Sequence, residues 1–272
     1  MQELKAWPVA ERLRVTGVFT DIDDTLTTDG VITPDALTAL ANLKAAGFAI
    51  IAITGRPVGW SEPLARALPV DAIVAENGAV LLHLKSQKGP QPNEYRRKQL
   101  LKSYQQDAST RVDNQARMRQ VAAQVLREVP GTVLARDSAG RETDMAIDHS
   151  EFEHLPPAQT AAVVRIMQSH GMNATVSSIH INGWFGLHNK LQGARWALRQ
   201  LWGRDLDAEL GQWVFVGDST NDELMFEAFA QSVGVANVRR FEAQLRHKPR
   251  FVTEGERGVG FAEVARALLA AH

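Results

Sequence analysis

The sequence contains no cysteine, and this absence excludes several kinds of chemistry at once. Disulfides, zinc sites with thiolate ligands and catalysis by a thiol are all ruled out. No apolar run approaches the roughly 18–20 residues that a membrane-spanning helix needs. Residues 1–14 alternate charged and apolar positions and lack the continuous apolar stretch of a secretory signal. We therefore predict a cytoplasmic protein that does not bind membranes.

A strong excess of either charge is also missing. The 30 Lys and Arg residues are balanced by 31 Asp and Glu residues, which gives a net charge of -1. Proteins that bind nucleic acids, or that are held at membranes by basic clusters, carry a marked basic excess. We expect neither partner. The 272 residues, 44% of them hydrophobic, suffice for one large domain or two modest ones. The sequence does not indicate an oligomeric state.

Two stretches of the chain, 15–80 and 190–272, alternate short apolar runs with helical patterns. In the first, Thr33 and Pro34 form a helix start and Gly47 a helix end. Apolar strands that alternate with helices predict a parallel sheet covered on both faces. The expected strands are 15–19, 48–53, 72–75, 213–216, 232–235 and 251–253, and the expected helices include 58–67, 190–202 and 222–230.

The middle of the chain is built differently. Residues 84–110 are polar, and 88–92 are rich in Pro and Gly. Strand-like residues 132–136 and 143–147 flank a Ser-Ala-Gly turn, which predicts a hairpin. We predict an α/β protein, with a Rossmann-like doubly wound parallel sheet as its core and an inserted α+β cap domain. The predicted core comprises 1–83 and 188–272, and the predicted cap 84–187.

The most informative stretch is Asp21-Ile22-Asp23-Asp24-Thr25, directly after the first apolar strand. On extended backbone, residues two apart point the same way, so Asp21 and Asp23 would share a face. One carboxylate can stay ionised as a nucleophile and ligand, while the other acts as an acid. A lone Asp here would be read as a turn or helix cap. The offsets of Thr25 and Leu26 favour the functional reading.

A second acidic stretch, Gly217-Asp218-Ser219-Thr220-Asn221-Asp222, follows a later apolar strand. If the two strands are parallel neighbours, their carboxylates meet at one edge of the sheet. Clustered carboxylates need a cation or widely separated pKa values. Asp218 can reach a metal, and Asn221 and Asp222 can orient its ligands and waters. Asp222 could equally be only a helix cap. Together these motifs suggest a hard metal ion and phosphate chemistry.

Two weaker signals complete the set. Thr54-Gly55-Arg56 ends a buried strand, where a hydroxyl and free backbone N–H groups suit a phosphate oxygen. By itself this could be an ordinary turn with Arg56 in solvent. Lys190 begins a helix, where its charge opposes the helix dipole. It could be a surface lysine, but offsetting carboxylate charge and holding a phosphoryl group would explain its place.

In order along the chain, these motifs resemble the four motifs of the haloacid dehalogenase-like phosphohydrolases. The match consists of Asp21-x-Asp23-x-Thr25, Thr54-Gly55-Arg56, Lys190 and Gly217-Asp218-x-x-Asn221-Asp222. The stretch Glu76-Asn77-Gly78-Ala79 and the long insertion resemble the Cof-type branch, subfamily IIB, with its C2 cap. That branch includes the sucrose-phosphate and mannosyl-3-phosphoglycerate phosphatases.

The resemblance implies roles for these residues. Asp21 would be the nucleophile that forms an aspartyl-phosphate, and Asp23 the general acid and base. Mg²⁺ would be held by the Asp21 carboxylate, the Asp23 main-chain carbonyl and Asp218. Thr54 and Lys190 would contact the phosphoryl group. Asp24 departs from the pattern, because many Cof-type members have glycine there.

We predict the remaining substrate-binding positions more loosely. Thr25, Gly55 and Arg56 are expected near the phosphate. On the segment that returns from the cap, His180, Asn182, Trp184 and His188 are candidates for contacting the leaving group. Trp184 could stack on a sugar, or pack in the core, and the histidines could instead lie on a solvated strand face. Further candidates around the hairpin are Arg136, Arg141 and Asp144.

The predicted function is Mg²⁺-dependent hydrolysis of a small phosphorylated metabolite, with a sugar phosphate as the expected substrate by analogy. One alternative is a phosphosugar mutase that uses the same site. Another is a phospho-acceptor signalling protein, although such receivers need only about 120 residues. A third, a binding protein without activity, conflicts with the presence of Asp23.

Overall fold

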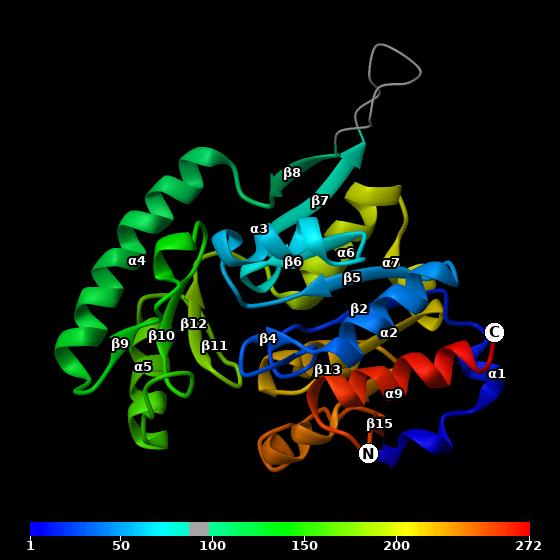
Figure 1. Cartoon of the computed structure of the whole chain (residues 1–272). Helices are drawn as coiled ribbons and strands as arrows, with labels where there is room; N and C mark the ends of the chain where they lie inside the picture. The colour runs from blue at the N-terminus through cyan, green and yellow to red at the C-terminus, as the bar shows by residue number, and fades with distance from the viewer. Residues whose placement is uncertain (87–97) are drawn as a thin grey trace.

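The computed structural model describes residues 1–86 and 98–272, and the Pro-Gly-rich stretch 88–92 lies outside them. A nine-stranded sheet forms the centre of the larger part (Figure 1). Its order is β1-β15-β14-β13-β2-β5-β6-β7-β8. The strands are β1 (Gln2–Glu3), β2 (Gly17–Thr20), β5 (Ala49–Ile53), β6 (Ala72–Ala75), β7 (Val80–Ser86), β8 (Lys98–Tyr104), β13 (Trp213–Gly217), β14 (Ser232–Gly234) and β15 (Phe251–Val252).

Within this sheet order, the strands from β1 through β15, β14, β13, β2 and β5 to β6 run parallel to one another. At one edge of the sheet, β7 and β8 are added as antiparallel strands. β2 lies between β13 and β5, although almost two hundred residues of sequence separate β2 from β13. β13, β2 and β6 are buried throughout, as expected for strands covered on both faces. The predicted α/β fold class is confirmed.

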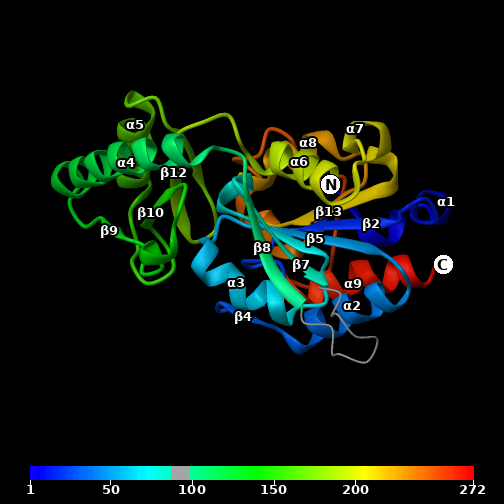
Figure 2. The same cartoon turned by 90° about the horizontal axis from the view of Figure 1, so that it is seen from above.

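Helices cover both faces of this sheet (Figure 2). One face packs against α2 (Pro34–Ala45), α3 (Val58–Ala67) and α9 (Arg257–Leu269). The other packs against α6 (Lys190–Trp202), α7 (Leu206–Glu209) and α8 (Glu223–Ala228). The Thr33 hydroxyl accepts a hydrogen bond from the Ala36 N–H, so the predicted start of α2 is confirmed. Shorter elements are η1 (Leu4–Ala6), α1 (Val9–Arg12), β3 (Thr27–Thr28), β4 (Val31–Ile32), η2 (Glu76–Gly78), η4 (Leu210–Gln212), η5 (Thr220–Asp222) and η6 (Ala236–Phe241).

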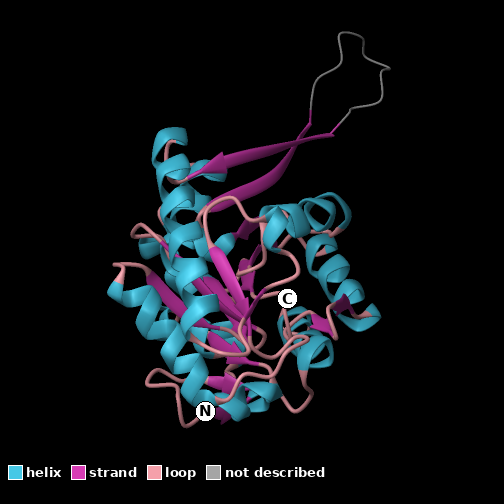
Figure 3. Cartoon of the chain, turned by 90° about the vertical axis from the view of Figure 1, so that its left-hand side faces the viewer, coloured by secondary structure: helices cyan, strands magenta, loops and turns pink. Residues whose placement is uncertain are grey.

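The middle of the chain forms a second, four-stranded antiparallel sheet beside the first (Figures 1 and 3). Its order is β11-β12-β10-β9, and α4 and α5 complete a separate hydrophobic core. The predicted hairpin is present, because β9 pairs with β10 across η3. The elements are α4 (Ala108–Glu128), β9 (Val133–Leu134), η3 (Ser138–Gly140), β10 (Met145–Asp148), α5 (Pro157–Ser169), β11 (Asn173–Val176) and β12 (His180–Trp184).

Along the chain, the boundary between the two sheets lies at a different residue from the predicted domain boundary. Residue 84, the predicted start of the cap, lies inside β7, which pairs with β8 along its whole length. Both strands belong to the large sheet, so the antiparallel unit begins after Tyr104. We therefore use the word cap for residues 105–187. Within this polar stretch, Lys98–Tyr104 form β8, a half-exposed edge strand of the large sheet and not part of the smaller one.

Candidate active site

Three neighbouring parallel strands end at the same edge of the large sheet and place the predicted motifs together. Asp21 follows β2, Thr54 follows β5 and Asp218 follows β13. The Asp21 N–H donates to the Val216 carbonyl oxygen, which fixes the first motif against the strand that carries the second. All three side chains are buried. The sequence is thus folded so that acidic groups from distant segments share one crevice.

Lys190 lies inside this crevice and not at the surface. Its Nζ donates to Asp21 Oδ1 at 2.6 Å and to Asp222 Oδ1 at 2.7 Å. Burial lowers the pKa of Lys190, but the charges of the two carboxylates outweigh burial and raise it. Lys190 is therefore a fixed cation at the start of α6, in electrostatic contact with the predicted nucleophile.

Asp222 caps the turn after β13, which is one of the roles that the sequence left open, and it also contacts Lys190. Its Oδ2 accepts the N–H groups of Asp218 and Ser219, and with Ser219 it forms a capping box. Its Oδ1 accepts from Lys190. Asp222 therefore holds the turn after β13 and anchors Lys190. Asn221 lies nearby on the same turn, and its Oδ1 accepts from the Ser219 hydroxyl.

Asp218 carries the clearest sign of a metal site. Its Oδ2 accepts from Asn237 Nδ2 at 3.1 Å, while its Oδ1 is buried and has no hydrogen-bond partner among the described residues. Oxygens of Asp21, Asp218 and Asp222 lie within 4.8 Å of one another. An unpartnered buried carboxylate oxygen is costly, and a cation would satisfy it. Carboxylate oxygens are the ligands that Mg²⁺ prefers, so these residues fit the predicted metal.

The pKa values of the acidic groups in the crevice are raised, because these groups are buried and lie close to one another. Burial raises the pKa of Asp21 to about 8, the Asp222 and Asp23 charges add to this, and Lys190 opposes it. Burial and the Asp21 and Asp222 charges raise the pKa of Asp218 well above its usual value. Without a metal the crevice favours the neutral form of these carboxyls. A bound cation would favour the charged form.

Asp23 points away from Lys190 toward a different cation. Arg56 Nε lies 2.9 Å from Asp23 Oδ1 and 3.1 Å from Oδ2. The Thr54 hydroxyl lies 3.5 Å from the same carboxylate and accepts the Arg56 N–H. Burial raises the pKa of Asp23, and Arg56 opposes that rise. The predicted nucleophile and the predicted acid are thus next to different cations, which lets their protonation differ.

Asp24, which departs from the family pattern, occupies a left-handed backbone position with φ of 53°. Glycine adopts this conformation at little cost, whereas an aspartate is strained there. Here Asn237 Nδ2 donates to the Asp24 carbonyl oxygen, and Arg257 Nε lies 3.0 Å from its carboxylate. These contacts stabilise the strained position. Asn237 therefore ties Asp24 to Asp218, a link that no sequence motif indicated.

Cap residues reach the core through buried polar contacts. Asn182 Nδ2 donates to the Gly55 carbonyl oxygen at 3.3 Å, and Arg141 Nη1 donates to the same oxygen at 3.0 Å. His180 Nε2 lies 2.8 Å from Glu151. The predicted candidates His180 and Asn182 therefore lie at the crevice, as does Gly55, and Arg141 holds the cap to the strand end.

Trp184 and His188 are placed differently from the prediction that they contact the leaving group. The Trp184 ring is buried, stacks on His188 at 5.6 Å, and donates its indole N–H to the His188 carbonyl oxygen. Neither residue lines the cavities at Asp21 or Asp23. Trp184 therefore packs in the core, which is the alternative that the sequence left open. Thr25 is buried beside the first motif, and its hydroxyl has no partner among the described residues.

The structure also shows contacts that sequence reasoning missed. Asp137 and Glu151, both from the cap, accept hydrogen bonds from Arg56. Glu76, at a left-handed position after β6, accepts the N–H groups of Glu142 and Thr143 and so joins core to cap. Acidic residues on irregular loops carry no periodic signal, so only the fold could assign these partners.

The cap closes tightly over Asp21. The cavity bounded by Asp21, Gly55, His180 and Asn182 measures about 10 Å³, roughly the room for one water. A larger cavity of about 430 Å³ adjoins it and reaches Asp23, Arg56 and Asp218. A phosphoryl group can therefore reach Asp21 only if the cap or these side chains move.

Residues 18–115 match the model of the haloacid dehalogenase-like hydrolase family. The resemblance predicted from the motifs is confirmed. Solved structures with similar folds include a Thermoplasma acidophilum protein, with a TM-score of 0.69 and 15% identity over 94% of this chain and 98% of that one. No curated protein sequence matches this chain significantly.

Two further solved structures have similar folds. The sucrose-phosphatase of Synechocystis aligns with a TM-score of 0.61 and 15% identity, covering 93% of this chain and 97% of that one. A haloacid dehalogenase-like hydrolase from Bacteroides thetaiotaomicron has a TM-score of 0.62 and 15% identity, over 93% and 98%. At 15% identity, these neighbours show that this chain shares their fold. In the described part of the chain, no helix is long and apolar enough to cross a membrane.

Proposed function

We propose that the protein is a Mg²⁺-dependent phosphomonoester hydrolase that acts on a small phosphorylated metabolite, specifically a sugar phosphate. The observation that carries this proposal is the pairing of Asp21 with Lys190 beside the unpartnered oxygen of Asp218. A nucleophilic carboxylate, a fixed cation and an open ligand position are the parts that phosphoryl transfer requires. The sugar phosphatases among the structural neighbours support the choice of substrate.

Three groups would hold the metal: the Asp21 carboxylate, the Asp23 main-chain carbonyl and Asp218. Bound there, Mg²⁺ would neutralise charge on the phosphoryl oxygens. Lys190 and Thr54 would contact the same oxygens. Asp222 would keep Lys190 in place, as its 2.7 Å contact suggests, and Asn221 would orient the turn that bears Asp218.

The chemistry would take place in two displacements. In the first, an Asp21 oxygen bonds to phosphorus, the bond to the leaving oxygen breaks, and Asp23 gives its proton to that oxygen. In the second, Asp23 takes a proton from water as the water attacks phosphorus, which releases phosphate and restores the Asp21 carboxylate. Arg56 positions Asp23 throughout, through its two contacts with that carboxylate.

Phosphate release from a panel of sugar phosphates and p-nitrophenyl phosphate, with Mg²⁺ and with EDTA, tests the proposal. We expect release with Mg²⁺ and none with EDTA. Equal release under both conditions would contradict the metal's role. Interconversion of sugar phosphates without net release would instead indicate the mutase. A long-lived phosphoprotein without turnover would indicate a phospho-acceptor.

A further inference from the structure

The cavity of about 430 Å³ beside Asp23 is the space available for the leaving group. Its size falls in the range of small-molecule sites. Asp23, which would protonate the leaving oxygen, forms part of its wall, and the cap contributes the loops at 150–152 and 178–179. The core contributes residues 27–30 and the segment around Arg240. The charges on this wall decide which leaving groups the site accepts.

Carboxylates predominate on that wall. Five acidic side chains and three guanidinium groups line the cavity. Each guanidinium is already paired: Arg56 with Asp23 and Glu151, Arg240 with Glu256, and Arg257 with Asp24. Among the described lining residues, then, every arginine has a carboxylate partner. A second negative charge on the substrate would have to compete with these carboxylates for a cation.

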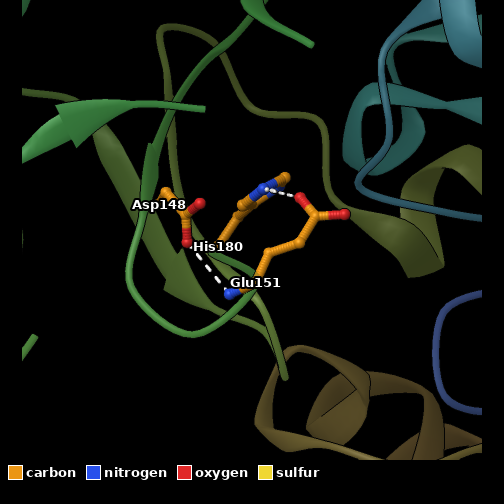
Figure 4. A group of neighbouring side chains, drawn as sticks. All are labelled: Asp148, Glu151 and His180. Carbon is orange, nitrogen blue, oxygen red and sulfur yellow. Dashed lines mark hydrogen bonds and ion pairs between the residues drawn. The ribbon is translucent and has the colours of Figure 1, made fainter. Parts of the chain in front are cut away.

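Glu151 is the acidic residue that the cap contributes to the cavity wall, and hydrogen bonds tie its loop to Asp148 (Figure 4). Asp148, at the end of β10, accepts the backbone N–H groups of Ser150, Glu151 and Phe152. The Glu151 side chain then lies 2.8 Å from His180 Nε2 and 2.7 Å from Arg56 Nη2.

This group also resembles a cation site, because oxygens and a nitrogen of Asp148, Glu151 and His180 lie within 4.8 Å of one another. Each member is already engaged with the backbone, with Arg56 or with its neighbour, so we do not assign a cation there. Burial raises the pKa of Glu151, but hydrogen bonds from His180 and Arg56 outweigh burial and lower it to about 2. Glu151 is thus ionised at neutral pH and remains 19% exposed toward the cavity.

We infer that the site selects phosphomonoesters whose leaving group carries hydroxyls and no second negative charge, with Glu151 as the cap residue that enforces this choice. The inference rests on the proposed function and narrows its substrate class. Arg56 is shared among Asp23, Asp137 and Glu151, so one guanidinium group faces three carboxyl groups and does not cancel the charge of Glu151. Hydroxyls can donate to the Glu151 carboxylate, whereas a carboxylate or second phosphate would meet it as a like charge in a partly desolvated cavity. Glu151 is a specificity residue and takes no part in the chemical step.

Matched substrate pairs test the inference on the whole protein with Mg²⁺. Glycerol 3-phosphate is compared with 3-phosphoglycerate, and glucose 6-phosphate with 6-phosphogluconate, so that each pair differs mainly by a carboxylate. We expect kcat/KM to be about tenfold or more higher for the uncharged member, which corresponds to roughly 1.4 kcal/mol. The gap should narrow at high salt, because the discrimination is electrostatic. Equal or reversed preference in both pairs would overturn the inference.

Two variants assign the selectivity to Glu151. Glu151→Gln keeps the shape and removes the charge, and we expect it to reduce the wild-type ratio severalfold, mainly through a lower KM for the anionic members. Glu153→Gln, at an exposed position in the same loop, is the control and should keep the wild-type ratio. A ratio that Glu151→Gln leaves unchanged would overturn the role of Glu151. No release from any phosphomonoester, p-nitrophenyl phosphate included, would instead overturn the proposed function itself.

Discussion

Three buried carboxylates lie close together at Lys190, and the ammonium group of Lys190 contacts two of them. Asp21 and Asp222 contact Lys190, while Asp218 has Asn237 on one oxygen and no partner on the other among the described residues. Such an arrangement lowers the stability of the metal-free protein and favours the binding of a cation. Residues at functional sites commonly sacrifice stability in this way.

The substitution Asp218→Asn tests this balance. In the metal-free crevice, burial and the neighbouring carboxylates raise the pKa of Asp218 well above its usual value, which costs stability at neutral pH. Asparagine cannot ionise and keeps an oxygen to accept from Asn237, so we expect the free energy of unfolding in EDTA to rise by about 1–2 kcal/mol. Mg²⁺ should raise the melting temperature of the wild type and leave that of the variant unchanged. Asp113→Asn, at an exposed position of α4, should behave as the wild type in both buffers. A variant that is less stable in EDTA would contradict this account.

His188 offers a second test, through pH. Burial lowers its pKa to about 4, so the unfolded chain binds a proton between about pH 6.5 and pH 4 that the folded chain rejects. Stability from this group is therefore complete above pH 6.5 and is lost as pH falls, by about 2–3 kcal/mol at pH 4.5. Denaturation of His188→Gln at pH 7 and pH 4.5 should show a smaller acid loss than the wild type. His154→Gln, at an exposed site, should show the full loss.

For individual residues, the sequence predicted the positions of the core motifs better than those of the cap residues. Asp21, Asp218 and Lys190 follow strands or start a helix, so their spacing to regular elements locates them. Their catalytic and ligand roles stay predictions. Trp184 has the same strand alternation as its neighbours, yet its ring turns inward to His188. The alternation indicates two faces and cannot say which face meets a ligand.

Among the elements, α6 is the one whose packing places a charged residue in the site. A Cβ added to Gly193, one turn beyond Lys190, would lie 2.5 Å from Gly78 Cα in η2. Gly78 itself has φ of 109°, a value that side chains disfavour. These two glycines let the helix approach the turn after β6, and this approach brings Lys190 to Asp21.

Gly193→Ala should therefore push α6 outward. Overpacking lowers the free energy of unfolding by about 1–3 kcal/mol. The better helix propensity of alanine raises it by about 1 kcal/mol. We expect a net loss of up to about 2 kcal/mol in chemical denaturation. We also expect a lower kcat, because Lys190 moves with the helix. Gln192→Ala, at the neighbouring exposed position, should change neither. Unchanged activity and stability in Gly193→Ala would show that the close approach is unnecessary.

The strands show where local pattern suffices and where it does not. β5, β6 and β13 are continuous apolar runs, so the sequence located them closely. β8 is polar and half exposed, and β1 is only two residues long, so neither has a pattern that separates it from a loop. Both are defined by pairing with β7 and β15, partners that tertiary structure alone supplies.

In the whole molecule, the cap and the core are joined by polar contacts around the site. Arg56 reaches Asp137 and Glu151, and Arg141 reaches the Gly55 carbonyl oxygen. Beside them, η3 of the cap meets α3 of the core, where a Cβ on Gly140 would lie 3.2 Å from Gly59 Cα. Because the cavity at Asp21 is nearly filled, the proposed reaction would require this interface to open and close.

Gly140→Val should keep the cap from seating. We expect kcat/KM for a sugar phosphate to fall about tenfold, because water is excluded less well and the leaving group loses its cap contacts. The melting temperature should change little, since η3 lies at the rim of the interface. Ala139→Val, exposed on the same turn, serves as the control. Full activity in Gly140→Val would contradict a closing cap.

The most direct test of the account is to trap the phosphoryl group on Asp21. Wild-type protein with Mg²⁺ is mixed with a phosphate-labelled sugar phosphate, quenched in acid within milliseconds, and digested for mass spectrometry. The account predicts label on the peptide that contains Asp21, its loss on treatment with hydroxylamine, and neither label nor turnover in Asp21→Asn. Steady phosphate release by Asp21→Asn at the wild-type rate would contradict it.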